Sequence, residues 1–273
     1  MVQAPPVAVV GCGRTGGSIG LALVRAGYPV VAAWSPTASG RDRARELLAV
    51  DVPDSLADAA APAEVLILAV PDDAIEKASV DLAPAATGKL VAHTSGATSV
   101  AALDAVAEAG ARTASLHPLQ TLPDPRTGAD ALRGAAVAVT ATEPDRPTLH
   151  AIAEAWGGLP FDLDDEAKPL YHAAAVFASN YAAAAVVAGL RLLEQAGVRD
   201  PAGTLALLVS RSALNAVEHG AITGPAARGD VGTISRHVAL LRGTSYEDAY
   251  RSLAVLAAHL SGSDAGAVAE AAR

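Results

Sequence analysis

Three glycines, Gly11, Gly13 and Gly16, follow a short apolar run at residues 7–10 and open a helical stretch at residues 15–26. In a strand–turn–helix unit of this kind, the first glycine permits a tight turn, the second admits a diphosphate to the backbone, and the third lets helix and strand pack closely. Free N–H groups at the helix start can then hold phosphate oxygens. The sequence therefore predicts a dinucleotide site made by Gly11, Cys12, Gly13, Arg14, Thr15 and Gly16.

Short apolar runs alternate with helical patterns over the first half of the chain. The expected strands are residues 7–10, 30–33, 65–70, 90–93, 113–116 and 135–139, and the expected helices are 15–26, 41–48, 73–82, 100–109 and 144–156. Repeated alternation predicts an α/β fold with helices on both faces of the sheet. We expect an N-terminal Rossmann domain with a doubly wound, mostly parallel sheet.

The pattern changes after Phe161, and no alternating strand pattern follows. Helical periodicity covers residues 166–196, 201–219, 230–242 and 245–261, while the last ten residues are expected to fray. The sequence predicts an NADP-binding, Rossmann-like domain at residues 1–162 and an all-α C-terminal domain for substrate binding and dimerisation at residues 163–273.

Composition narrows the classes of partner. The net charge of −9 gives no general attraction to nucleic acid or anionic lipid, so neither is expected as a partner. The single cysteine, Cys12, and the absence of a charged segment before the first apolar run favour a cytoplasmic protein. The mostly apolar stretch from Ala173 to Leu193 is interpreted as a helix buried between protein surfaces, and no metal-binding pattern is present.

The residues after the second strand indicate which dinucleotide is preferred. Domains that select NAD usually carry an Asp or Glu about 20 residues after the glycines. This chain has Trp34 and Ser35 there, with Arg41 and Arg43 in the next helix, so a 2′-phosphate would meet a hydroxyl and guanidinium donors. We therefore expect NADPH to be preferred over NADH, although the arginines also fit a solvated helix face.

Polar side chains follow several strands at the edge where ligands bind in doubly wound sheets. Val70 and Pro71 are expected under the nicotinamide, Ser95 follows the fourth strand, and His117 follows the fifth. Ser95 suits a ribose or a substrate carboxylate better than a nucleophilic role. A structural role is the competing interpretation for His117, because partly buried histidines often only donate hydrogen bonds.

A second polar group lies on the long helix that starts the helical half. At 100° per residue, Lys168, His172, Ser179 and Asn180 share one stripe of an otherwise apolar helix. These residues fit one wall of an active site. Alternatively, Lys168 and His172 cap the start of the helix, and the other polar residues form a hydrogen bond between helices. Further along, Arg228 suits a substrate carboxylate, or an ion pair with Asp230.

These motifs together resemble a family of predicted oxidoreductases that join a Rossmann-like domain to a helical domain of unknown function. The segments that carry the resemblance are the glycine series, Ala69–Asp72, His93–Ala97, Leu116–Gln120, Tyr171–Ala175, Ala178–Tyr181, Leu214–Asn215, Thr223–Pro225 and Arg228–Asp230. The helical domain is similar to that of the 6-phosphogluconate dehydrogenase C-terminal-like superfamily. The resemblance implies a homodimer formed through the helical domain and, from members described as ketopantoate reductases, a branched 2-oxo acid substrate.

One departure from the superfamily affects the catalytic roles. Its β-hydroxyacid branch uses Lys-x-x-x-Asn on this helix, but His172 stands four residues after Lys168, and Val176 stands four residues before Asn180. We therefore expect His172 to protonate the substrate oxygen in NADPH-dependent reduction of a small 2-oxo acid. Asn180, Ser179 and Ser95 would orient that oxygen, and Arg228 or His117 would meet the carboxylate. A dinucleotide-binding sensor without turnover is the alternative, and participation of a deazaflavin stays open.

Overall fold

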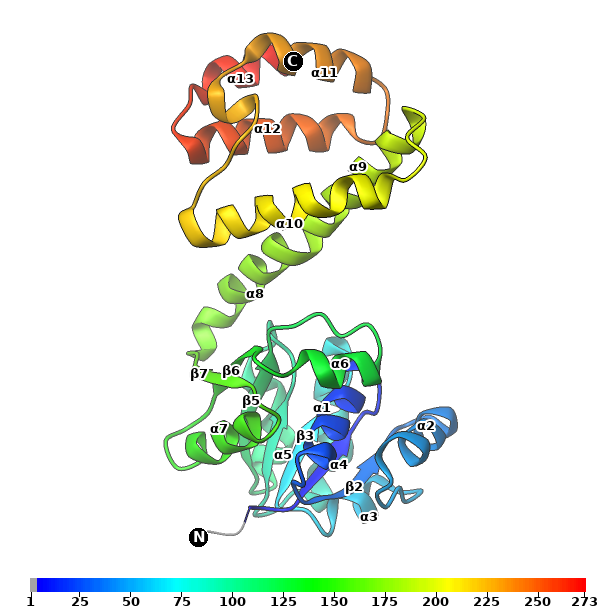
Figure 1. The fold of residues 1–273 in the computed structure, drawn as a ribbon. Helices are drawn as coiled ribbons and strands as arrows, with labels where there is room; N and C mark the ends of the chain where they lie inside the picture. The colour runs from blue at the N-terminus through cyan, green and yellow to red at the C-terminus, as the bar shows by residue number, and fades with distance from the viewer. Residues whose placement is uncertain (1–3) are drawn as a thin grey trace. The chain divides into compact units, whose positions relative to one another are not determined.

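The computed structural model describes residues 4–273, and the chain forms two compact units, Met1–Val176 and Phe177–Arg273 (Figure 1). The last strand ends at Asp162, the residue where the sequence placed the end of the first domain. The following helix, α8 (Lys168–Val176), is still part of the first compact unit.

The first unit is built on a seven-stranded sheet. Its strands lie in the order β2-β1-β3-β4-β5-β6-β7, and every neighbouring pair is parallel except β5 and β6. The mostly parallel sheet predicted from the sequence is confirmed. The strands are β1 (Val7–Val10), β2 (Val30–Trp34), β3 (Val65–Leu68), β4 (Leu90–His93), β5 (Arg112–Pro118), β6 (Ala136–Thr140) and β7 (Leu159–Asp162).

The edge strand β7 was not predicted. Its four residues include Pro160, and none of them is buried, so the segment lacks the apolar run that marked the other strands. Proline is tolerated at a sheet edge because no further strand needs its missing N–H group.

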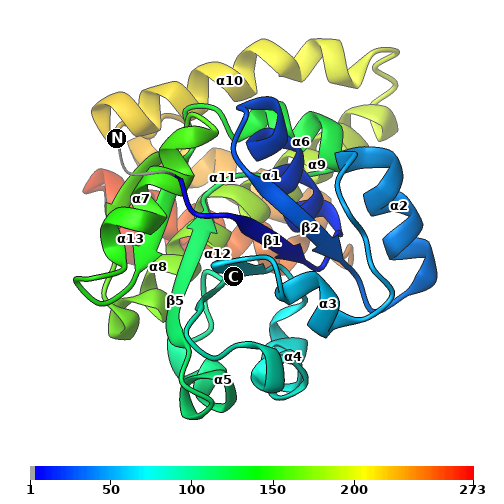
Figure 2. The same ribbon diagram turned by 90° about the horizontal axis from the view of Figure 1, so that it is seen from below.

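Helices cover both faces of the sheet (Figure 2). One apolar core contains Ile19, Leu48, Leu132 and Ile152, and the other contains Ala60, Ile75 and Val106. The first face carries α1 (Arg14–Arg25), α2 (Ala38–Leu48), α6 (Pro125–Ala131) and α7 (Arg146–Ala155), and the second carries α3 (Leu56–Ala60), α4 (Ile75–Leu82) and α5 (Asp104–Glu108). The short helices α3 and α6 were not predicted.

The helix that starts with α8 continues through a π-helical segment, η5 (Phe177–Tyr181), into α9 (Ala182–Gln195). From Asp165 to Gln195 it is long and apolar enough to cross a membrane, by length and composition alone. We predicted that this helix is buried between protein surfaces. Within the described residues none of its most apolar stretch is buried, so that prediction is wrong for the single chain.

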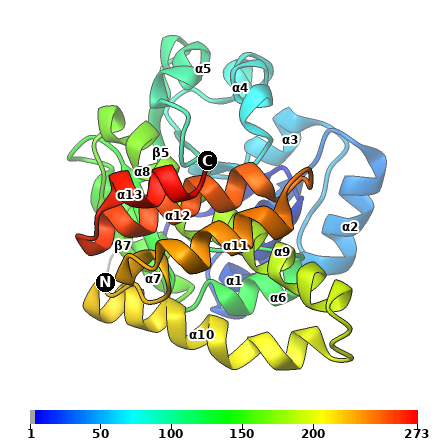
Figure 3. The same ribbon diagram turned by 90° about the horizontal axis from the view of Figure 1, so that it is seen from above.

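The second unit contains only helices, namely η5, α9, α10 (Pro201–His219), a short turn η6 (Ala226–Arg228), α11 (Val231–Leu241), α12 (Glu247–Ser261) and α13 (Ala265–Ala271). Figure 3 shows α11, α12 and α13 side by side, and their shared core includes Ile234, Ala258 and Val268. The expectation that the last ten residues fray was wrong. Asp264 caps α13, and burial of Val268 holds this helix against the core.

Candidate functional site

The glycine turn between β1 and α1 has the shape that its sequence predicted. Gly11 has a φ of +95°, and a Cβ there would lie 2.4 Å from the carbonyl oxygen of Ala69. A Cβ at Gly16 would lie 1.9 Å from the carbonyl oxygen of Gly11. At Gly13 a Cβ would meet no atom within 4 Å, so this glycine faces open space. The conformation of the turn thus requires glycine at positions 11 and 16, whereas Gly13 leaves space beside the turn for a ligand.

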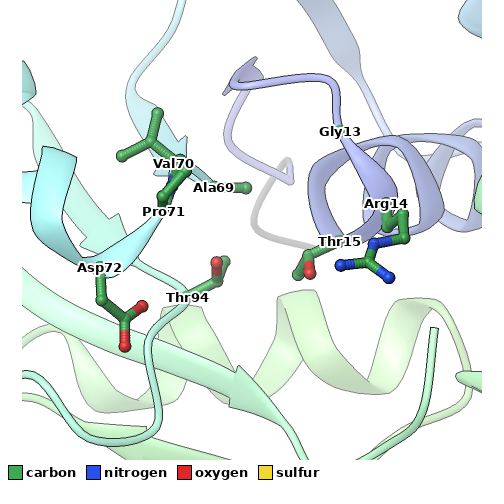
Figure 4. Close-up of a pocket in the computed structure, with 8 residues that line it drawn as sticks. All are labelled: Gly13, Arg14, Thr15, Ala69, Val70, Pro71, Asp72 and Thr94. Carbon is green, nitrogen blue, oxygen red and sulfur yellow. The ribbon is translucent and has the colours of Figure 1, made fainter. Parts of the chain in front are cut away.

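A pocket of about 380 Å³ adjoins this turn (Figure 4). Gly13, Arg14 and Thr15 lie on one side of it, the segment Ala69–Asp72 lies on the other, and Thr94 stands between them. Gly13 caps α1 without any side-chain hydrogen bond, which leaves the first N–H groups of the helix open to a ligand. The residues present therefore fit a bound diphosphate.

The remaining residues predicted to bind the cofactor differ in what their side chains can do. Cys12 is buried, with Sγ 3.6 Å from the carbonyl oxygen of Trp34, and burial raises the pKa of its thiol to about 11. Only its backbone can face a cofactor. At the end of β2, Arg41 donates to the carbonyl oxygen of Ser35 at 3.0 Å. No ion pair of Arg43 is found among residues 4–273.

A second pocket, of about 420 Å³, adjoins the first, and Arg14, Thr15 and Thr94 line both. His117, at the end of β5, lines the second pocket. The rest of its lining is Pro118, Gln120, Thr121, Leu122 and Pro123, so Arg14 is its only permanently charged side chain. The first pocket, which could hold a dinucleotide, thus adjoins a second pocket that could hold another molecule beside His117.

The structure brings three aromatic and imidazole side chains together at His117. The hydroxyl of Tyr171 lies 2.9 Å from Nδ1 of His117. The ring centroid of His172 lies 6.3 Å from that of His117. Gly96 makes room for the imidazole, because a Cβ there would lie 2.7 Å from Cε1 of His117. We refer to His117, Tyr171 and His172 as the imidazole cluster.

Titration of the imidazole cluster is controlled by burial and by neighbouring charges. Burial lowers the pKa of His117 to about 4, helped by His172 and Lys168 and opposed by Asp72. Burial also raises the pKa of Tyr171 to about 12. At neutral pH His117 is therefore an uncharged imidazole, and Tyr171 keeps its proton.

Lys168 lies at the base of α8 and is almost fully buried, with 1% of its surface exposed. Its ammonium group donates to Oγ of Ser115 at 2.6 Å. Burial lowers the pKa of Lys168 to about 8, against the opposite effects of Asp165 and Asp72. The sequence placed Lys168 on a polar stripe with His172, but periodicity did not reveal that this end of the stripe is buried on β5.

His93, the last residue of β4, and Ser95, which follows the strand, make hydrogen bonds within this segment. The Ser95 hydroxyl donates to Thr98 at 2.9 Å and accepts from the backbone N–H of Thr98 at 3.0 Å, so it shapes the loop. Nδ1 of His93 accepts from the Ser95 N–H at 3.2 Å, and burial lowers the pKa of His93 to about 3. The other ring nitrogen, Nε2 of His93, is buried and has no hydrogen-bond partner among the described residues.

The other predicted site residues belong to the second unit. Ser179 and Asn180 lie in the π-helical segment, where the turn is wider than the 3.6 residues assumed in the stripe, and π-turns frequently occur at functional sites. Arg228 ends the turn η6. Asp230 accepts from the N–H of Thr233 at 3.0 Å and thereby caps α11, and no ion pair between Asp230 and Arg228 is found among the described residues.

Two family models match different parts of the chain. A model of a Rossmann-like domain matches residues 3–118, and a model of a domain of unknown function, DUF2520, matches residues 135–256. A comparison with curated proteins gave no match.

Several solved structures have a similar fold. A candidate NADP oxidoreductase from Bacteroides fragilis is 21% identical, with a TM-score of 0.81 over 95% of this chain and 100% of that one. An imine reductase from Streptomyces aurantiacus is 18% identical, with a TM-score of 0.69 over 98% and 99%. A reductive aminase from Aspergillus terreus, in complex with NADPH4, cyclohexanone and allyl amine, is 18% identical, with a TM-score of 0.61 over 97% and 90%.

At these identities the similarity shows the fold, while the two family models identify the domains. The sequence motifs had indicated a Rossmann-like domain joined to a helical domain of unknown function, and that expectation is confirmed. Residues 3–118 of the chain are similar to Rossmann-like domains, and residues 135–256 are similar to DUF2520, a domain of unknown function.

Proposed function

We propose that this chain is an NADPH-dependent oxidoreductase that reduces a C=O or C=N group in a small substrate. The observation that carries the proposal is the junction of two pockets in the first unit, where Arg14, Thr15 and Thr94 line both. One pocket offers the open start of α1 to a diphosphate, and the other offers His117 to a substrate. Structures of similar fold named as an NADP oxidoreductase and as an NADPH4-bound reductive aminase support the same class.

The cofactor would be held by the glycine turn and by the residues that follow β2 and β3. Backbone N–H groups at Gly13, Arg14 and Thr15 would bind the diphosphate. Ser35, Arg41 and Arg43 would meet the 2′-phosphate, with Arg43 contributing most because Arg41 already donates to the Ser35 carbonyl. Val70 and Pro71, which line the first pocket, would support the nicotinamide end.

NADPH, when bound, supplies a hydride, which adds to the substrate carbon while the attached oxygen or nitrogen takes a proton. His172 is the proposed proton donor, because its imidazole belongs to the cluster at the second pocket. Ser179 and Asn180 are proposed to orient the polar atom of the substrate, while Ser95, whose hydroxyl already donates to Thr98, is proposed to shape the loop beside the site. Arg228 is proposed to meet a carboxylate. A small 2-oxo acid, of which ketopantoate is one, is the leading substrate class.

Two measurements on the full chain test this proposal. Calorimetric titration with NADPH and NADH should give uptake of both, with tighter binding of NADPH. Incubation of the NADPH-loaded protein with a panel of 2-oxo acids, including ketopantoate, and of imines should then lower absorbance at the nicotinamide band. Binding without oxidation of NADPH by any substrate would support a sensor without turnover. No uptake of either nucleotide would overturn the proposal.

We also propose that a second copy of the chain covers α9 and α10. Neither helix has a buried residue in the described chain, and both expose large apolar side chains, including Val187, Leu207, Leu208 and Val217. Sedimentation should show a dimer, and Leu207→Asp should shift it to monomer, whereas Val80→Asp on the first unit should not. A wild-type monomer, or a dimer that persists in Leu207→Asp, would contradict the proposal.

A further inference from the structure

His117 has a defined hydrogen-bonding arrangement that the reduction proposed above does not yet use. Its Nδ1 is paired with the hydroxyl of Tyr171 at 2.9 Å, and its ring rests against Gly96. The same imidazole lines the second pocket. Nδ1 is therefore used in a hydrogen bond within the protein, and Nε2 is the ring nitrogen that can form a hydrogen bond with a substrate.

The partner of Nδ1 determines where the single proton of a neutral imidazole resides. Among residues 4–273, the Tyr171 hydroxyl has no hydrogen-bond partner other than His117. If Nδ1 carried the proton and donated to Tyr171, the phenolic proton would lack an acceptor within the described chain. Donation from the Tyr171 hydroxyl to Nδ1 satisfies both groups and leaves the imidazole proton on Nε2.

The charges that face His117 keep the imidazole neutral. The His172 ring and the buried Lys168 ammonium oppose a positive charge on His117, burial does so more strongly, and only Asp72 favours it. The neighbouring Tyr171 is uncharged at neutral pH, because burial raises its pKa. His117 therefore enters the pocket as a hydrogen-bond donor without charge, a form that can polarise a carbonyl group.

We propose that Nε2–H of His117 holds the oxygen of the substrate carbonyl, with Tyr171 as the residue that fixes this tautomer, and that the site thereby selects carbonyl compounds over iminium ions. This inference rests on the proposed function and names its substrate class. It departs from the imine chemistry in the names of two proteins of similar fold.

The selectivity follows from the chemistry of the two substrate groups. A carbonyl oxygen has lone pairs that accept from Nε2–H, and it gains negative charge as the carbon receives hydride, so the hydrogen bond strengthens during reduction. An iminium nitrogen has no lone pair and carries a positive charge. It would meet the Nε2–H donor and the Arg14 guanidinium in the second pocket. The one carboxylate that lines either of these two pockets in the described chain, Asp72, lines the first pocket and not the second.

The kinetic test compares carbonyl substrates with iminium substrates of similar size, namely cyclopentanone with N-methyl-1-pyrrolinium, and a 2-oxo acid with a cyclic imino acid at a pH where its nitrogen is protonated. The NADPH-loaded wild type should reduce the carbonyl member of each pair at least about tenfold faster. His117→Leu should lower carbonyl turnover by about a hundredfold, and His117→Gln, which keeps a neutral N–H donor, should restore part of it. Faster reduction of the imine members would overturn the inference.

The role of Tyr171 requires a readout that is independent of turnover. Nitrogen NMR of histidine-labelled wild type without nucleotide should show His117 protonated on Nε2 only, throughout the neutral range. Tyr171→Phe should mix the two tautomers and reduce carbonyl turnover about tenfold, with NADPH affinity unchanged. Tyr28→Phe is the matched control, because the Tyr28 hydroxyl is buried without a hydrogen-bond partner among the described residues.

The outcomes separate this inference from the function on which it rests. A doubly protonated His117 at neutral pH, or a proton on Nδ1, would overturn the inference even if NADPH is oxidised by carbonyl substrates. NADPH uptake without turnover of any carbonyl or imine would overturn both the proposed reductase and carbonyl selection. Failure to bind NADPH would overturn the proposed function, while the NMR measurement would still decide the state of His117.

Discussion

The hydroxyl of Tyr171 on α8 lies 2.9 Å from Nδ1 of His117 on β5. Three residues before Tyr171, Lys168 donates to Ser115 on the same strand. Residues three apart share a helix face, and residues two apart share a strand face, so one face of α8 is joined to one face of β5 by two polar contacts. His117, which we propose to contact the substrate, lies on this face of β5. The geometry of the candidate site therefore depends on how α8 packs against β5.

Lys168→Met should change how stability depends on pH. In the folded chain burial lowers the pKa of Lys168 from 10.5 to about 8, so the unfolded chain binds more protons between these pH values. Stability due to this lysine therefore rises with pH across that window, by at most about 1.4 kcal/mol per pH unit. Urea unfolding of wild type and Lys168→Met should show their difference moving in favour of wild type as pH rises. A constant difference would show that Lys168 titrates normally.

Acid should destabilise the protein through its buried histidines. Burial lowers the pKa of His93 to about 3 and that of His117 to about 4, from 6.5. Below pH 6.5 these histidines bind protons in the unfolded chain but not in the folded chain. The free energy of unfolding therefore falls toward pH 4 by up to about 1.4 kcal/mol per pH unit for each histidine. His93→Asn keeps an acceptor for the Ser95 N–H and should remove one contribution. If the free energy of unfolding of His93→Asn depends on pH as steeply as that of wild type, the lowered pKa of His93 is contradicted.

Gly13→Ala should separate cofactor binding from folding. Gly13 has a φ of −78°, which alanine tolerates, and its Cβ would meet no protein atom within 4 Å. The melting temperature should therefore stay near that of wild type, while NADPH affinity falls at least about tenfold because the methyl group occupies the space proposed for the diphosphate. Gly232→Ala, at a helical glycine with ordinary contacts, should alter neither property. In contrast, Gly16→Ala should destabilise the fold itself, since its Cβ would overlap the Gly11 carbonyl. Unchanged NADPH affinity in Gly13→Ala would place the nucleotide elsewhere.

Much of the fold could be predicted because buried parallel strands are continuous apolar runs, as in Val7–Val10 and Val65–Leu68. The edge strand Leu159–Asp162 lacks such a run and was missed. The helix Ala265–Ala271 was also missed, because its stability comes from Val268 packing against other helices and not from its own seven residues.

The candidate site could be predicted only in part. Spacing alone identified the glycine turn and the strand-end residue His117, since both follow from where strands stop. It could not identify the partner of His117. Helical periodicity places Tyr171 on the same helix face as Lys168, but it does not show which strand that face packs against. The π-helical segment Phe177–Tyr181 also departs from the regular spacing assumed for Ser179 and Asn180.

Arg43→Ala should reduce the preference for NADPH over NADH. Arg41 donates to the Ser35 carbonyl, and Arg45 pairs with Asp42, whereas no ion pair of Arg43 is found in the described chain. A guanidinium that binds the 2′-phosphate contributes a charge-assisted hydrogen bond, so NADPH should bind about tenfold more weakly in the variant and NADH about equally well. Calorimetry with both nucleotides measures the change. Equal weakening of both would show that Arg43 acts on the shared part of the molecule or on the fold.

His172→Ala should slow the chemical step without affecting the cofactor. The His172 ring belongs to the imidazole cluster, 6.3 Å from His117 between ring centroids, and removal of a general acid typically costs about a hundredfold or more in kcat. NADPH affinity should stay at the wild-type value, because His172 does not line the pocket at the glycine turn. His150→Ala is the matched control, since that imidazole pairs with Asp162 at the edge of the sheet. Single-turnover measurement of NADPH oxidation separates chemistry from product release. An unchanged rate in His172→Ala would assign the proton to another donor, with Tyr171 the next to test through its own variant.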